Sequence, residues 1–203
     1  MANKSTLIIG IIVIILFIMA GYFLFVGDSV TVTMDGENVS SQIIVSPFAG
    51  VDTNELNEEI CNYTMQSMHN PSGDFTELRQ GILRICLSHG LSNVKLTINT
   101  PLGQNKIPIV FHVEGSSMYP TLNDGQTIMV QKTKDIQVGN IVVANSSEYG
   151  IIVKRVSEIN GERVHLTSDN TDTNYEYING TMHEMRGIDT WVNINDIYGV
   201  VQI

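Results

Sequence analysis

The pattern of apolar and polar residues divides the chain into three stretches, and the first is an unbroken apolar run. Residues Leu7–Val26 contain no charged side chain. At about 1.5 Å per residue, a helix over this run spans about 30 Å, the thickness of the hydrocarbon core of a bilayer. A cleaved leader usually has a shorter apolar region followed by a small-residue site, whereas this run exits into Gly27-Asp28-Ser29. The run therefore predicts a retained transmembrane anchor at 7–26.

Charges beside the run predict its orientation. Lys4 precedes it, and Asp28, Asp35 and Glu37 follow it. Because positive charge stays on the cytoplasmic side of a spanning helix, residues 1–6 are expected in the cytoplasm and the rest of the chain outside it. The predicted location is the cell membrane, in a single-pass topology with the lipid bilayer as a partner.

The second stretch changes from a strand pattern to a helix pattern. Apolar residues alternate with polar ones over Val30–Met34, and an Asp-Gly turn signal follows, which predicts a membrane-proximal β segment over 27–50. Residues 51–100 show helical spacing that begins after the candidate N-cap Asp52, with one break. They predict a small helical extension that ends in a strand at 94–98.

The third stretch, residues 101–203, has the pattern of a compact catalytic or binding domain built from strands. Short β-branched runs recur at even spacing, and glycines separate many of them. The predicted fold class is mainly β, a coiled barrel or sandwich. We expect its strands at 107–113, 127–131, 140–144, 150–156, 163–167 and 198–203.

Composition narrows the chemistry. The formal net charge of -10 argues against a nucleic-acid surface, which needs clustered lysine and arginine. No Cys-x-x-Cys or His-x-x-x-His pattern occurs, so neither a metal nor another cofactor is expected. Cys61 and Cys86 both fall on the apolar side of their predicted helices, and a disulfide is permitted outside the cytoplasm. We predict that they are joined, with two buried thiols as the alternative.

Two local patterns suggest catalysis. Ser117 lies in Gly115–Leu122, which follows a strand and ends in a proline turn, where a serine can present its hydroxyl and its amide to a bound carbonyl. Lys154 interrupts an apolar strand and shares its face with Ile152. Burial disfavours an ammonium and lowers its pKa, and a neutral lysine can take the proton of a serine hydroxyl. Each pattern alone is weak, because serines in turns and lysines on solvated strands are common.

Together these segments resemble the signal peptidase I family. SSMYPTL resembles its Ser-Met-x-Pro-Thr box, with Ser117 at the nucleophile, and IIVKRV resembles the box that carries the general-base lysine, here Lys154. LNDGQTIMVQKTKDIQVGNIVVA resembles the box between them, and Ser168-Asp169-Asn170 resembles the Gly-Asp-Asn box that supports the site. The boxes stand in family order over residues 107–203.

The resemblance implies a membrane-anchored serine endopeptidase with a Ser-Lys dyad. Its substrates would be exported preproteins with small residues just before the cleaved bond. The same resemblance implies substrate or oxyanion support from Gly115, Ser116, Met118 and Pro120. It also implies structural support of the site from Arg155, Asp169 and Asn170.

Three positions depart from the family pattern. Gly115 stands where some members have a serine that binds the oxyanion, which leaves more of that work to the nucleophile's own N–H. Asn174 is the positional match for a hydroxyl residue that orients the lysine, and Glu176 falls where the family has an aspartate. A carboxylate in contact with the lysine would stabilise the protonated ammonium of that lysine. We therefore expect Asp169 and Glu176 to engage a different cation, such as Arg155.

Two other interpretations stay open. VKRVSEINGERVHLTSDN also resembles the lysine region of self-cleaving SOS-type repressors, so the chain could be an anchored regulator that cleaves itself, with Ala49-Gly50 as the conceivable site. It could instead be a non-catalytic β module that binds exported peptides. Such a module needs neither Ser117 nor Lys154, so their presence together argues against it.

Overall fold

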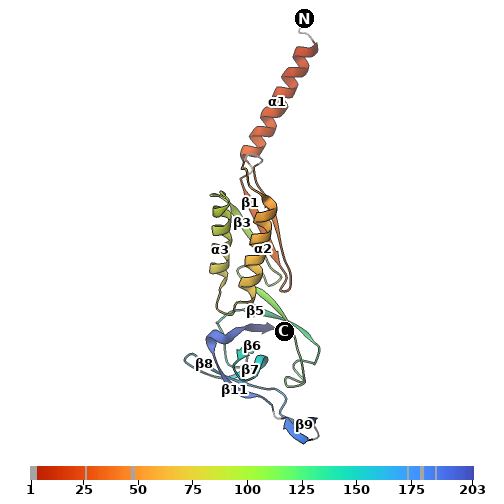
Figure 1. Cartoon of the computed structure of the whole chain (residues 1–203), viewed down its shortest axis with the longest axis vertical. Helices are drawn as coiled ribbons and strands as arrows, with labels where there is room; N and C mark the ends of the chain where they lie inside the picture. Colours follow the sequence, from red (N-terminus) through yellow and green to blue (C-terminus); the bar gives the residue numbers. More distant parts are fainter. Residues whose placement is uncertain (1–3, 26, 47–48, 173, 179–180, 186) are drawn as a thin grey trace.

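The chain folds into a long, narrow molecule with its N-terminal helix at one end (Figure 1). The computed structural model describes residues 4–25, 27–46, 49–172, 174–178, 181–185 and 187–203. A small α+β unit follows the N-terminal helix, and a β unit lies at the opposite end (Figure 1). We call these the proximal unit, built from β1, β2, α2, α3 and β3, and the distal unit, built from the strands that follow.

The N-terminal helix, α1, runs Lys4–Phe25. Between residues 8 and 18 its large apolar side chains stand exposed, and Phe17 is 76% exposed. Among the described residues, no helix is both long enough and apolar enough to cross a membrane.

The proximal unit joins the predicted β segment, helices and strand into one packed body. Strand β1 (Ser29–Met34) pairs antiparallel with β2 (Val39–Ile44) and parallel with β3 (Lys95–Asn99), in the order β2-β1-β3. Helix α2 (Thr53–His69) begins after the expected N-cap Asp52, and helix α3 (Phe75–Ser88) follows the break in the helical spacing. The side chains of Asp52 and Asp74 cap them by accepting backbone N–H bonds.

One apolar core holds the proximal unit together. Helix α2 buries every fourth residue, from Leu56 to Met68, which is the spacing of one helix face. These residues share a core with the inward side chains of β1 and with α3. The β segment and the helical extension expected from the sequence are therefore packed on each other.

The two cysteines are free thiols, so the predicted disulfide is wrong. Cys86 is buried on the inner stripe of α3, next to Ile82. Cys61 lies one position beyond the buried stripe of α2, and its Sγ contacts the Asn57 Oδ1 at 3.8 Å. The periodicity placed both residues on apolar sides without distinguishing the centre of a helix face from its margin.

The distal unit is mainly β, as predicted, and its strands form a curled sheet of seven in the order β11-β8-β7-β6-β12-β5-β4. A separate two-stranded hairpin, β9–β10, projects from it (Figure 1). The six expected strand runs are confirmed, and β9, β10 and β11 are additional. The elements are β4 (Pro108–His112), β5 (Thr127–Lys132), β6 (Ile141–Ser146), β7 (Gly150–Asn160), β8 (Arg163–Thr167), β9 (Asn174–Ile178), β10 (Thr181–Met185), β11 (Asp189–Asn193), the 3₁₀ turn Ile194–Asp196 and β12 (Ile197–Gln202).

Strand β6 explains why parts of the sequence of this unit are continuous apolar runs without alternating polar residues. Ile141 and Val143 point into one core, which also contains Met118 and Leu122. Val142 and Ala144 point into a second core on the other face of the sheet. Because the curled sheet covers both faces of β6, alternation is lost there, and the neighbouring strand β7 is held between the same two cores.

Candidate active site

The loop that carries Ser117 is fixed at both of its ends. At its start, the Gly115 N–H donates to the Asp124 Oδ1 at 2.8 Å, and the φ of +83° at Gly115 suits a residue without a Cβ. Further on, Met118 and Leu122 are 0% and 1% exposed and pack into the first distal core. With the loop fixed by these contacts, the Ser117 side chain points out of the core, towards β7.

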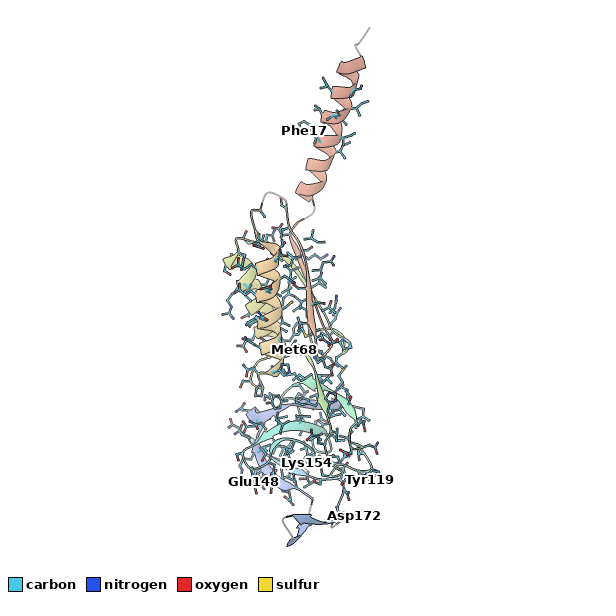
Figure 2. All side chains as sticks on the ribbon, turned by 45° about the vertical axis from the view of Figure 1, so that its right-hand side comes forward. Phe17, Met68, Tyr119, Glu148, Lys154 and Asp172 are labelled. Atoms are coloured by element: carbon cyan, nitrogen blue, oxygen red, sulfur yellow. The ribbon has the colours of Figure 1, made fainter. Side chains whose placement is uncertain are left out.

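Strand β7 brings Lys154 to this serine. The Lys154 side chain is only 2% exposed and lies on the buried face of β7 with Ile152 and Val156, as the period-two pattern predicted. Its Nζ lies 2.8 Å from the Ser117 Oγ and 2.9 Å from the Val153 carbonyl oxygen. Figure 2 shows Lys154 in the distal unit, at the end of the molecule away from α1. Residues 37 positions apart therefore form a direct pair.

The surroundings of Lys154 favour its neutral form. Burial is the main cause that lowers the pKa of Lys154, from 10.5 to about 8, and the negative charge of Asp169 partly opposes it. At neutral pH a minority of such side chains is already uncharged, unlike an ordinary lysine. In the neutral form, Nζ can accept the proton of the Ser117 hydroxyl across the 2.8 Å contact.

Asp169 engages Arg155, which confirms that part of the expectation. Arg155 donates from Nε to Oδ1 at 2.7 Å and from Nη2 to Oδ2 at 2.6 Å, and the Thr121 hydroxyl also donates to Oδ2. The bonds from Arg155 are the main cause that holds the pKa of Asp169 below its ordinary value. The side chains of Asn174 and Glu176 lie outside the described residues.

Asn170 holds the serine loop from the opposite side. Its backbone N–H donates to the Ser117 carbonyl at 2.9 Å, and its side-chain Nδ2 donates to the Ser116 carbonyl at 3.0 Å. Two consecutive peptide groups of the loop are thus fixed by one residue. The segment 168–170 therefore supports the loop backbone, while Asp169 supports β7.

A cavity of about 340 Å³ opens beside the Ser117–Lys154 pair. Seven of its twelve lining residues are aliphatic, and polar groups, including those of the ionisable Glu114 and His112, form a comparable part of its surface. Besides the pair, the lining residues are Phe111, His112, Val113, Glu114, Ile128, Val143, Ile151, Ile152, Val153 and Ile188.

The other site residues expected from the sequence occupy different places. Gly115 begins the loop and Ser116 is exposed beside Ser117, whereas Met118 is turned into the core and Pro120 lies on the surface. No sequence pattern separately indicated Thr121 as a partner of Asp169. It also did not indicate the cavity walls, because they come from strands that are far apart along the chain. Among the described residues no cluster of three metal-ligating side chains occurs.

A second serine–histidine contact lies elsewhere on the distal unit. The Ser157 Oγ is 2.7 Å from the His165 Nδ1, and the other ring nitrogen of His165 bonds Asp189. The imidazole stacks on Trp191 with ring centroids 4.7 Å apart. None of these residues lines the cavity beside Ser117, so His165 cannot serve that hydroxyl.

Comparison with known proteins agrees with this geometry. The family model described as Peptidase S24-like matches residues 81–188, slightly more than half of the chain, and includes the serine loop and Lys154. Signal peptidase I T of Bacillus subtilis is 42% identical over 73 residues, which are 34% of this chain and 35% of that protein. Signal peptidase IB of Staphylococcus aureus is 34% identical over 74 residues, which are 34% of this chain and 36% of its own length. The matched region thus spans about a third of these curated relatives.

Proposed function

The chain belongs to the Peptidase S24-like family, and from this premise we propose that it is a serine endopeptidase with Ser117 as nucleophile and Lys154 as general base. The observation that carries the proposal is the 2.8 Å contact between the Ser117 Oγ and the nearly inaccessible Lys154 Nζ. A buried lysine costs folding free energy because the ammonium loses its hydration. A role as a base explains why the fold keeps one beside a serine.

The proposed reaction uses only groups of this chain, the peptide and water. Neutral Lys154 removes the hydroxyl proton as the Ser117 Oγ attacks the scissile carbonyl. The resulting ammonium gives its proton to the leaving amine, and the acyl ester formed on Ser117 is hydrolysed by a water that Lys154 deprotonates in turn. The Ser117 N–H is our candidate donor to the oxyanion, because Gly115 offers no hydroxyl there.

The proposed substrates are signal peptides of exported proteins. The valines and isoleucines in the cavity beside Ser117 favour a small apolar side chain next to the cleaved bond. The named relatives are signal peptidases, 42% and 34% identical to this chain over about a third of its length. Glu114 and His112 at the cavity also allow a polar residue to be accommodated nearby.

We propose further that residues 7–26 anchor the enzyme in the cell membrane, with both folded units outside the cytoplasm. The support is the uninterrupted apolar sequence, which includes residues whose side chains are not described. The exposed apolar side chains between residues 8 and 18 of α1 would face lipid in such an arrangement.

Self-cleavage at Ala49-Gly50 is less well supported. This dipeptide lies just before α2, whereas Lys154 lies beyond the opposite end of that helix (Figures 1 and 2). The 17 residues of α2 alone separate the two places by about 25 Å. Cleavage within one molecule would require the proximal unit to unfold.

Incubation of the full chain in detergent micelles with a peptide that spans a signal-peptide junction tests the proposal. We expect a single cut after a small residue, read from the product masses, and no cut by a Ser117→Ala variant purified in the same way. Equal cleavage by both proteins, or none by the unmodified chain, would refute the proposed activity.

A further inference from the structure

We propose that the proximal unit acts as a spacer that selects substrates whose cleaved bond lies far from the membrane. The inference rests on the proposed function and on the proposed anchor. Both figures show the order along the long axis: α1, then the proximal unit, then the distal unit, in which Figure 2 labels Lys154. The chain therefore leaves the proposed anchor at one end of the folded body, while its catalytic pair lies near the other end.

The length of the spacer follows from α2. Its 17 residues rise about 25 Å along the long axis of the proximal unit. Its first turn lies near α1 and its last turn, which contains Met68, faces the distal unit (Figure 2). The Ser117–Lys154 pair lies beyond that last turn, so about 25 Å is a lower limit for its height above residue 28.

The first residue of the spacer, Asp28, is held by two hydrogen bonds within the proximal unit. The Asp28 Oδ1 accepts the Ser46 N–H at 3.1 Å, and the Asp28 carbonyl accepts the Lys95 N–H at 2.9 Å. Asp28 is thus fixed to both the hairpin and β3 of the proximal unit. The base of the spacer therefore begins at Asp28, two residues after the end of the proposed anchor.

The junction between the two units is also tightly built. The Val110 N–H of β4 donates to the Gly36 carbonyl at 3.1 Å, and a Cβ at Gly36 would lie only 2.7 Å from the Val110 Cγ2. Lys132 of β5 reaches across and donates from Nζ to the Ser67 carbonyl in the last turn of α2. Ile107, just before β4, is buried in the core of the proximal unit.

A fixed height imposes a requirement on the substrate. An extended peptide covers at most about 3.3–3.6 Å per residue, so about seven residues or more are needed to span 25 Å. A signal peptide whose cleavage site directly follows its apolar region would hold the cleaved bond too close to the bilayer to reach this site. Among the proposed signal-peptide substrates, the favoured ones therefore have an extended segment of at least that length between the apolar region and the cleaved bond.

A series of tethered substrates tests the spacer. The full chain is reconstituted in phospholipid vesicles with substrates that differ only in the number of residues, from about three to about fourteen, between an apolar segment and one cleavage sequence. We expect cleavage to rise at least about tenfold once the segment exceeds about seven residues. A soluble peptide with the same cleavage sequence reports the intrinsic activity of the same preparation.

A matched variant carries a flexible Gly/Ser insertion between Gly27 and Asp28, which leaves both units and the catalytic pair unchanged. It should cut the soluble peptide at the normal rate and lose most of the dependence on segment length, since the body can then lie down on the bilayer. Equal cleavage of short and long substrates by the unmodified chain would overturn the spacer while the peptidase stands. An unchanged length dependence in the insertion variant would overturn it too. Failure to cut even the soluble peptide would instead refute the proposed function, and the spacer with it.

Discussion

Arg155 holds both carboxylate oxygens of Asp169 at once, through bonds of 2.7 Å and 2.6 Å. The fork geometry of the guanidinium matches a carboxylate, and such paired bonds are stronger and more directional than single ones. The pair ties β7, next to Lys154, to the segment that carries Asn170. It thereby fixes the lysine and the serine loop relative to each other, although neither member of the ion pair lines the cavity.

Arg155→Lys keeps the positive charge opposite Asp169 but removes the paired hydrogen bonds, so it tests how much the geometry of the contact contributes. We expect a loss of about 1 kcal/mol in the free energy of unfolding, because a lysine cannot bond both oxygens and the arginine is partly exposed. Cleavage should fall more than substrate binding, since the proposed catalytic pair, Ser117 and Lys154, loses its alignment. Urea denaturation and steady-state kinetics measure the two effects. Unchanged stability with unchanged turnover would show that the fork is not needed.

The acid limit of stability should depend on the same pair. The pKa of Asp169 is lowered in the folded state, chiefly by the bonds from Arg155. Its contribution to stability is therefore complete above the ordinary pKa of an aspartate and is lost as the pH falls through the lower, folded value. Asp169→Asn should be less stable than the unmodified chain at neutral pH, and the difference should shrink on acidification. A difference that stays constant with pH would exclude this linkage.

The two neighbouring serines should behave differently. Ser117→Ala removes the hydroxyl next to Lys154, and we expect cleavage to fall by about a thousandfold or more with little change in melting temperature. Ser116 is exposed, and its carbonyl, not its hydroxyl, is held by Asn170, so Ser116→Ala should keep most of the activity. The matched pair identifies the nucleophile. Loss of activity in the Ser116 variant alone would reverse the assignment.

The cysteines should both react with a thiol reagent once the chain is unfolded without reductant. In the folded chain, Cys61 should react first, because it is partly exposed, while burial protects Cys86 and raises its pKa. Mass measurement after alkylation counts the modified thiols in each state. An unmodified pair in the unfolded, unreduced chain would mean that a disulfide exists after all.

Local structure was largely predictable from the sequence because it depends on neighbouring residues. The start of α2 follows from the Asp52 cap, and its inner face follows from buried residues at every fourth position. The order of the distal strands was not predictable, since strand pairs such as β5–β12 join segments far apart in the chain. The error on Cys61 arose at the margin of a helix face, where a shift of one position decides which neighbour a side chain meets.

The candidate site was only partly predictable for the same reason. Ser117 and Lys154 were identifiable because each stands in a recognisable box, and the apolar flanks of Lys154 indicated its burial. No side-chain pattern indicated the two hydrogen bonds that Asn170 donates to carbonyls of the serine loop. Their acceptors are backbone groups of a segment that is distant in the chain. The parallel pairing of β1 with β3 could not be predicted from the sequence either. This pairing joins the two ends of the proximal unit into one body.

Lys154 should lower stability in a manner that depends on pH. Its folded pKa of about 8 lies below the ordinary 10.5, so the unfolded chain binds a proton more readily between these values. Stability of the unmodified chain should therefore rise as the pH increases through this window. We expect Lys154→Met to be more stable by about 2 kcal/mol at pH values below 8, with a gain that shrinks towards pH 10. Urea titrations at both ends of the window measure it, and a gain that does not vary with pH would show that Lys154 keeps its proton throughout.

The same shift predicts the pH dependence of cleavage. Because only neutral Lys154 can accept the Ser117 proton, the rate should rise with pH through a midpoint of about 8. Lys154→Arg should be as inactive as Lys154→Ala, since a guanidinium cannot act as a base in this range. Lys132 is the matched control: its pKa is also lowered by burial to about 8, but it lies at the junction of the two units, away from the cavity. Lys132→Arg should therefore leave the midpoint for a soluble peptide unchanged. Substantial cleavage by the Lys154→Arg variant, or a midpoint that moves with Lys132, would remove Lys154 from the role of general base.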